Sequence, residues 1–129
     1  MGRPREFNEE EVLNGAIALF GTRGFDAVSV DAVVTRLGLN RSSFYKIYGS
    51  KHGLLRMALE HACSNAESGR VDEHCKDLVV VALVEAAPVS NELRDLALRA
   101  ATLCFDSEAT LGEHLVSRAR HLTQQGERP

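Results

Sequence analysis

The segment Asn40–Tyr48 holds the side chains best suited to recognising another molecule. Phe44 and Tyr48 lie four residues apart, so on a helix they share one face and can pin it to a core. The opposite face then presents Arg41, Ser42, Tyr45 and Lys46. Arginine forms paired hydrogen bonds with guanine, serine reaches base edges or phosphates, and tyrosine and lysine suit phosphates. This arrangement predicts a helix that reads DNA, and the simpler alternative is a packed tyrosine beside solvated cations.

The charges around this segment favour a phosphate-facing surface, although the whole chain of 129 residues carries a net charge of -3. No acidic residue occurs from Ala32 to Leu59, and Arg3 and Arg5 add a basic N-terminal tail. The cations of the acid-free stretch are Arg36, Arg41, Lys46, Lys51 and Arg56. A basic segment in an acidic chain is typical of a protein with one surface toward nucleic acid. Charge alone fits a merely solvated face equally well.

Further candidates flank the reading segment. Lys51 falls in the first turn of the next predicted helix, where a cation beside unpaired backbone N–H groups forms a phosphate site. The complete set of predicted DNA-binding residues is Ser29, Arg36, Asn40, Arg41, Ser42, Ser43, Tyr45, Lys46 and Lys51.

The elements that must position these residues are all predicted to be helices. One helix runs from Glu9 to about Thr22 after an Asn8 cap, and a second runs from its Ser29 cap to Leu37. Gly38 closes the second helix in a left-handed conformation, and Asn40 caps a third helix to about Ile47. Two short helices joined by a tight glycine turn predict a helix-turn-helix. Ser50 caps a fourth helix.

The C-terminal half predicts a small helical dimerisation domain. Ser64–Arg70 is expected to be a linker, followed by a helix from about Asp72 to Ala87 that Pro88 ends. Its segment Leu78–Val84 is apolar nearly all round, which indicates burial on several sides.

After Ser90, apolar residues recur every three or four positions as far as Leu122. We expect one helix of about 35 residues there, roughly 50 Å long, with a break near Asp106 as the alternative. Its uncovered stripe, together with the preceding helix, predicts a homodimer.

The run from Glu11 to Leu59 resembles the DNA-binding domain of the TetR family of regulators. The residues that carry the resemblance are Ala16, Phe20, Gly24-Phe25, Ser29-Val30, Gly38-Leu39-Asn40, Phe44-Tyr45, Tyr48, Ser50-Lys51 and Leu54-Leu55. A weaker similarity runs from His74-Cys75 to Glu92-Leu93-Arg94 and matches the family's last two helices, which pair between subunits.

The resemblance implies a sequence-specific DNA-binding regulator, a repressor acting as a homodimer on a palindromic operator, with an unidentified small-molecule effector. The expected domains are a helix-turn-helix unit at 1–50, a connecting helix and linker at 51–70, and a dimerisation domain at 71–129. This last domain is reduced, because the family places several more helices before the final pair.

Other functions find less support in the sequence. No phosphate-binding glycine loop, nucleophile elbow or zinc-protease motif occurs, so we expect no catalytic residues, cofactor or enzyme activity. Cys63, Cys75 and Cys104 have no metal-ligand spacing and indicate reduced thiols, so we expect no metal site. A metal- or thiol-sensing module, and a helical dimerisation module that no longer binds DNA, remain as alternatives. With no signal peptide or long apolar run, we expect a cytoplasmic protein without a membrane segment.

Overall fold

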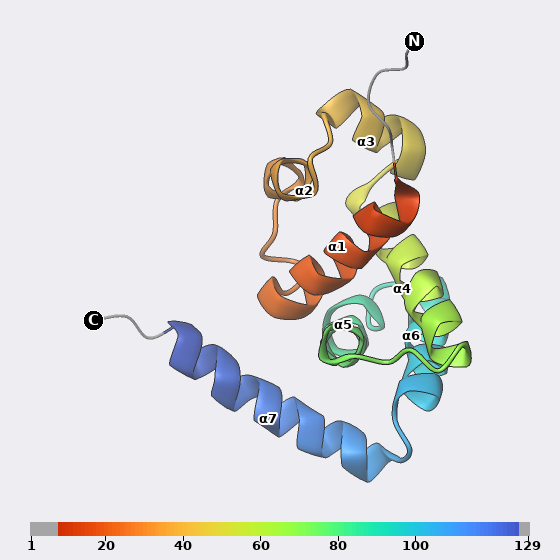
Figure 1. The fold of residues 1–129 in the computed structure, drawn as a ribbon, viewed down its shortest axis with the longest axis vertical. Coiled ribbons are helices and arrows are strands. Elements are labelled where there is room, and N and C mark those ends of the chain that lie inside the picture. The colour runs from red at the N-terminus through yellow and green to blue at the C-terminus, as the bar shows by residue number, and fades with distance from the viewer. Residues whose placement is uncertain (1–7, 127–129) are drawn as a thin grey trace.

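The computed structural model describes residues 8–126, and its side chains as far as His121. All regular structure in that part of the chain is helical, which confirms the all-α prediction (Figure 1). The elements are α1 (Glu9–Arg23), α2 (Val30–Leu37), α3 (Arg41–Tyr48), α4 (Lys51–Glu67), α5 (Glu73–Val81), a π-helical turn η1 (Ala82–Ala86), α6 (Asn91–Cys104) and α7 (Glu108–Gly126). Arg3 and Arg5, and the side chain of Leu122, lie outside the described residues. None of the described helices combines the length and apolarity needed to cross a membrane.

Side-chain caps start the N-terminal helices at the predicted residues. The Asn8 and Asn40 carboxamide oxygens accept from the backbone N–H groups of Glu11 and Ser43 at 3.0 and 2.7 Å. The Ser29 hydroxyl accepts from the Ala32 N–H at 3.0 Å. Such caps satisfy N–H groups that the first helical turn leaves without partners. The left-handed conformation predicted for Gly38 is confirmed, with φ of 73°.

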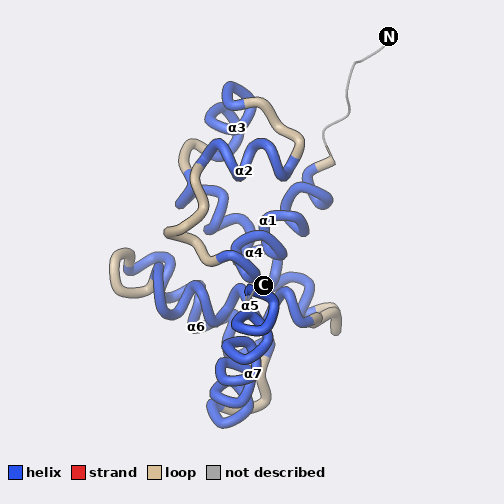
Figure 2. The backbone as a smooth tube through the Cα atoms, turned by 90° about the vertical axis from the view of Figure 1, so that its left-hand side faces the viewer, coloured by secondary structure: helices blue, strands red, loops and turns tan. Residues whose placement is uncertain are grey.

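Helices α1, α2 and α3 surround one end of a core that continues without interruption into the C-terminal helices. Figure 1 shows these three helices at the top, with α4, α5 and α6 beneath α1. The largest fully buried side chains include Phe20, Phe25 and Phe44 in the segment from α1 to α3, and Leu59 and Leu78 in α4 and α5. Figure 2 shows α4 leading from the upper unit into the lower helices, so both ends share one hydrophobic core.

Two predictions about the C-terminal helices need correction in detail. Helix α4 continues to Glu67, so the first four residues of the predicted linker Ser64–Arg70 are helical. The predicted helix from Asp72 to Ala87 does form, and Asp72 caps it, but its second half is a π-helical turn. The apolar residues 78–82 are all buried within this chain. Their hydrophobicity is therefore accounted for without a second subunit.

The prediction of one long helix after Ser90 is wrong, and the alternative break near Asp106 is confirmed. Helix α6 ends at Cys104, and Phe105 takes an extended conformation in which its ring is buried. Ser107 then starts α7, because its hydroxyl accepts from the Thr110 N–H at 3.2 Å while the Thr110 hydroxyl accepts from the Ser107 N–H at 3.1 Å. Burial of the Phe105 ring and the reciprocal cap between Ser107 and Thr110 stabilise the break, and they offset the backbone hydrogen bonds that a continuous helix would form.

Helix α1 approaches α5 most closely at Gly21. A β-carbon at that position would lie 2.9 Å from the Asp77 β-carbon and 3.1 Å from the His74 carbonyl oxygen. Glycine therefore sets the distance between the two helices, because any side chain would have to push rigid neighbours apart. Gly112 in α7 has no neighbour within 4 Å of such a β-carbon.

We expect Gly21→Ala to destabilise the protein by about 1–3 kcal/mol, because overpacking forces the backbones apart. Gly112→Ala is the matched control and should stabilise by about 0.5–1 kcal/mol, since alanine favours the helix and meets no obstacle. Urea unfolding followed by circular dichroism measures both free energies. Equal effects of the two substitutions would contradict the close approach at Gly21.

Candidate nucleic-acid interface

Helix α3 presents two faces of opposite character. Phe44 is fully buried and Tyr48 is 6% exposed, so both fix the helix to the core. The Phe44 ring stacks edge-on against Tyr45, with ring centroids 5.1 Å apart. The outer face carries the exposed side chains of Arg41, Ser42, Tyr45 and Lys46. The packing predicted from the spacing of Phe44 and Tyr48 is confirmed, and it leaves this outer face available to a ligand.

The guanidinium group of Arg41 is held between two other side chains on that face. It forms an ion pair with the Asp31 carboxylate, which projects from the first turn of α2. Its second terminal nitrogen lies 3.4 Å from the Tyr45 hydroxyl, and its central carbon lies 5.6 Å from the Tyr45 ring centroid. Arg41 therefore has neighbours that orient it, although the group remains exposed.

The other predicted site residues divide into two groups. The oxygens of Ser29 and Asn40 cap α2 and α3, and the Ser43 N–H donates to the Asn40 cap. Arg36 lies exposed in the last turn of α2. Contacts of all these residues with DNA stay predictions. The ion pair between Asp31 and Arg41 shows that the first turns of α2 and α3 lie close together.

Lys51 lies in the first turn of α4, as predicted, but the sequence did not indicate its contacts. Its ammonium group donates to the carbonyl oxygens of Phe25 and Val28, both at 2.8 Å, and lies 4.4 Å from the Phe25 ring centroid. These contacts tie the start of α4 to the loop between α1 and α2. Its role as a phosphate ligand stays a prediction, and the observed geometry is that of a positioning residue.

Glu85 is a positioning residue that the sequence did not reveal. Its carboxylate comes from the π-helical turn η1 and accepts from the backbone N–H groups of Phe25 and Asp26, both at 2.8 Å. Gly24, with φ of 92°, brings these N–H groups toward the carboxylate. No local pattern could reveal this contact, because the partners are about sixty positions apart in the chain. The loop is thus held by Glu85 through its N–H groups and by Lys51 through its carbonyls.

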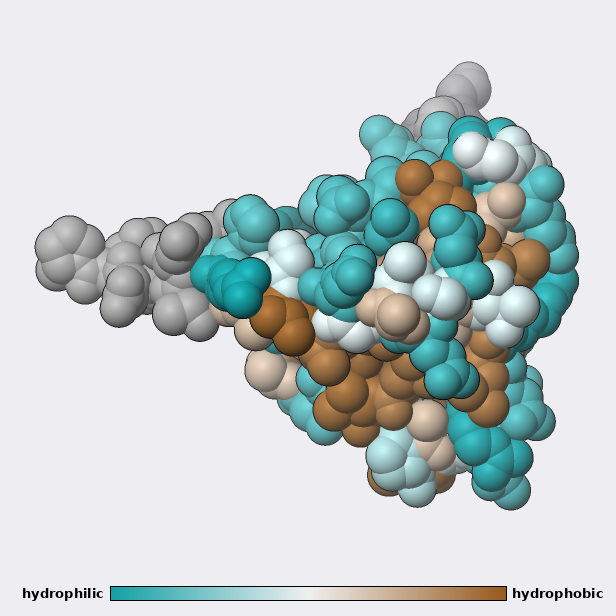
Figure 3. Space-filling model, turned by 90° about the horizontal axis from the view of Figure 1, so that it is seen from below, coloured by the Kyte–Doolittle hydropathy of each residue, from teal (hydrophilic) through white to brown (hydrophobic). Residues whose placement is uncertain are grey.

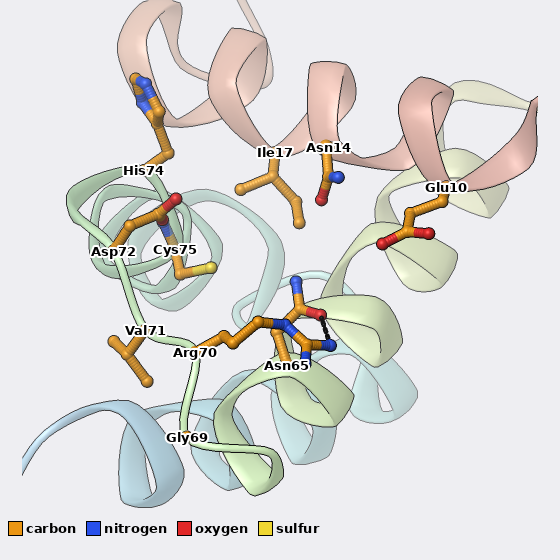
Figure 4. Close-up of a pocket in the computed structure, with 10 residues that line it drawn as sticks. All are labelled: Glu10, Asn14, Ile17, Asn65, Gly69, Arg70, Val71, Asp72, His74 and Cys75. Carbon is orange, nitrogen blue, oxygen red and sulfur yellow. Dashed lines mark hydrogen bonds between the residues drawn. The ribbon is translucent and has the colours of Figure 1, made fainter.

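The rest of α1 is joined to the C-terminal helices at separate points. Arg118 of α7 donates twice to the Gly21 carbonyl oxygen, at 3.0 and 2.7 Å. Near the other end, the Asn14 carboxamide oxygen lies 3.1 Å from His61 Nε2 in α4. A cleft of about 550 Å³ opens between α1, α4 and α5 beside Asn14 (Figure 4). Polar contacts at Asn14 and Gly21 therefore supplement the apolar packing of α1 against the C-terminal helices.

Buried titratable groups show little reactive character. Burial raises the pKa of Cys75 and of Cys104 to about 11, and it also raises the pKa of Cys63. Protonated thiols are weak nucleophiles and weak metal ligands, which disfavours a thiol-sensing role. Burial and then the Glu9 carboxylate raise the pKa of Tyr48 to about 12. Among the described residues, no three acidic, histidine or cysteine side chains are grouped to hold a metal ion.

Comparison with known proteins agrees with this geometry. The family model described as "Bacterial regulatory proteins, tetR family" matches residues 12–58, the region that contains α2 and α3. The N-terminal domain belongs to the TetR family. In this TetR-family domain, the matched region includes every one of the predicted DNA-binding residues, from Ser29 to Lys51.

Two relatives share the same region. The chain is 41% identical over 91 residues to the HTH-type transcriptional repressor BdcR of Escherichia coli (strain K12), covering 67% of this chain and 46% of that protein. It is 38% identical over 60 residues to the uncharacterized HTH-type transcriptional regulator YezE of Bacillus subtilis (strain 168), covering 46% of this chain and 31% of that protein. The chain thus spans less than half the length of either relative. No solved structure shows a significant match.

We expect Glu85→Ala to destabilise the TetR-family domain by about 1–3 kcal/mol, because two backbone N–H groups lose their charged acceptor. Amide hydrogen exchange at Phe25 and Asp26 should accelerate. Glu92→Ala, at an exposed carboxylate, is the control and should change stability by less than about 0.5 kcal/mol. Urea unfolding and NMR exchange measure the two effects. A Glu85 variant as stable as the Glu92 variant would show that the contact does not hold the loop.

Proposed function

We propose that this chain is a sequence-specific DNA-binding transcriptional regulator, that it represses, and that it acts as a homodimer in the cytoplasm. The observation that carries the proposal is the outer face of α3, where four exposed polar side chains project from a helix fixed by Phe44 and Tyr48. An exposed helix of this kind fits the major groove of B-DNA. The repressor assignment follows the name of the relative BdcR.

The side chains of the interface divide into base-reading and phosphate-binding groups. We propose that Arg41, in the first turn of α3, forms paired hydrogen bonds with a guanine and that Ser42 contacts a neighbouring base edge. Lys46 in the last turn of α3 and Arg36 in the last turn of α2 are suited to phosphates on either side. Lys51 then contributes by fixing the loop that precedes α2.

Selection of bound sequences from random duplex DNA with the purified protein tests the proposal, and a palindromic consensus is expected. Arg41→Ala should relax the preference at one base pair of each half-site, at a cost of about 1–3 kcal/mol. Lys46→Ala should weaken binding to all sequences and reduce the salt slope by about 0.9. If selection yields no consensus, or both variants lose affinity equally for operator and random DNA, the proposed division of roles is wrong.

The homodimer proposal draws on apolar side chains that the chain itself leaves exposed. Val84 in η1, Val89 in the turn that follows and Leu98 in the middle of α6 are 61%, 70% and 52% exposed. A groove of about 450 Å³ lies beside Leu98, between η1, α6 and α7, and includes Leu83 and Leu111. Figure 3 shows apolar side chains gathered on the side of the molecule seen from below. We propose that a second copy covers this surface. A dimer on a palindromic operator presents its two copies of α3 to successive turns of one DNA face, about 34 Å apart.

We expect the protein to sediment as a dimer at micromolar concentration and Leu98→Glu to sediment as a monomer, because a stable interface buries at least about 1,200 Å² and excludes unpaired charge. Ile47→Glu, which adds the same charge at an exposed apolar residue of α3, is the control and should remain dimeric. A monomeric wild type, or dimeric sedimentation of Leu98→Glu, would contradict the proposed interface.

A further inference from the structure

Asp31 puts a negative charge on the surface that is proposed to face DNA phosphates. It belongs to the first turn of α2, its side chain is 77% exposed, and it immediately precedes the acid-free stretch that begins at Ala32. A carboxylate beside a DNA backbone repels it, and so weakens binding to every sequence alike. Helix α2 does not depend on Asp31 to begin, because Ser29 already caps it. The position of the carboxylate therefore points to a role in selectivity.

The partner of Asp31 is the arginine best placed to read a base. Asp31 binds one terminal nitrogen of Arg41, while the Tyr45 hydroxyl lies 3.4 Å from the other. The Tyr45 ring lies beside the same guanidinium group. Contacts on both terminal nitrogens limit the rotation of the guanidinium plane, although Arg41 remains 54% exposed. Paired hydrogen bonds to guanine depend on the orientation of that plane.

We propose that Asp31 is a positioning residue that directs Arg41 to a base edge and away from the phosphates. The inference rests on the DNA-binding function proposed above. With Asp31 present, Arg41 is oriented before it meets DNA, so fewer conformations are lost on reading the correct base. Without Asp31, Arg41 is available to any nearby phosphate, and one repulsive charge disappears. Specificity then declines from two causes, because binding to random DNA improves while recognition of the operator does not.

The test measures dissociation constants of the full chain for the selected operator, for the operator changed at the base pair that Arg41 reads, and for random duplex, at several salt concentrations. For Asp31→Ala we expect the ratio of operator to random affinity to fall about ten-fold, within the range for losing one base contact. The salt slope for random DNA should steepen by about 0.9, as expected for one additional phosphate contact. Asp31→Glu should recover most of the specificity, since it restores the charge.

Two comparisons separate this role from general electrostatics and from folding. Asp26→Ala removes an exposed carboxylate from the same domain without touching Arg41, and it should leave the specificity ratio within about two-fold of wild type, as is usual for exposed sites. In an Arg41→Ala background, Asp31→Ala should have no further effect on discrimination at the base pair concerned. Unfolding midpoints of all variants confirm that they are folded.

The possible results distinguish the role of Asp31 from the DNA-binding function itself. The role of Asp31 is overturned if Asp31→Ala lowers the ratio of operator to random affinity no more than Asp26→Ala does. It is also overturned if Asp31→Ala reduces base-pair discrimination as much in the Arg41→Ala background as in the wild type. In both cases the DNA-binding function stands. A wild-type protein with no preference for any selected sequence overturns the DNA-binding function and this inference together.

Discussion

The structure depends on how the loop between α1 and α2 is held. Two side chains of opposite charge form hydrogen bonds with its backbone. The Glu85 carboxylate accepts from N–H groups, and the Lys51 ammonium donates to carbonyl oxygens. Such charge-assisted hydrogen bonds are stronger than those between neutral groups. Because the loop sets the direction in which α2 leaves α1, it also sets where α3 and its exposed side chains lie. The surface proposed to read DNA is therefore oriented by the contacts that hold this loop.

This arrangement makes the N-terminal unit part of a larger body. Helix α1 contributes to the core beneath α3, meets α5 at Gly21, and receives Arg118 from α7 at the Gly21 carbonyl. His114 of α7 binds Asp77 of α5 at 2.7 Å, next to the same contact. These contacts therefore join α5 and α7 to the end of α1 from which the loop begins. The domain boundaries at residues 50 and 70 stay predictions. Buried side chains on both sides of each boundary belong to one hydrophobic core.

The sequence predicted the features that depend on neighbouring residues. Caps such as Ser29 and Asn40, the glycine turn at Gly38, and the buried pair Phe44 and Tyr48 all follow from spacings of a few positions. Contacts between distant segments were beyond such reasoning, as Glu85 and Lys51 show. The run Leu78–Val84 contributed to the homodimer prediction, and its first five residues are buried within this chain while Val84 is 61% exposed. Sequence periodicity reports that a side chain is apolar on one face but not which chain covers it. The break at Phe105 was ambiguous for a similar reason, since apolar spacing continues across it.

The π-helical turn that carries Glu85 makes this part of the chain intolerant of changes in length. In η1 the Ala87 N–H donates to the Ala82 carbonyl at 2.9 Å, one position further back than in an α-helix. Removing one residue from 82–86 would restore regular α-helical bonding and rotate the residues after the turn by about 100° relative to those before it. Surface loops usually tolerate the insertion or deletion of a residue, because no packed element has to move. Here the deletion of a residue between α5 and Glu85 would move the carboxylate off the loop it supports. We therefore expect a change of one residue in length to destabilise the protein more at this turn than in a surface loop.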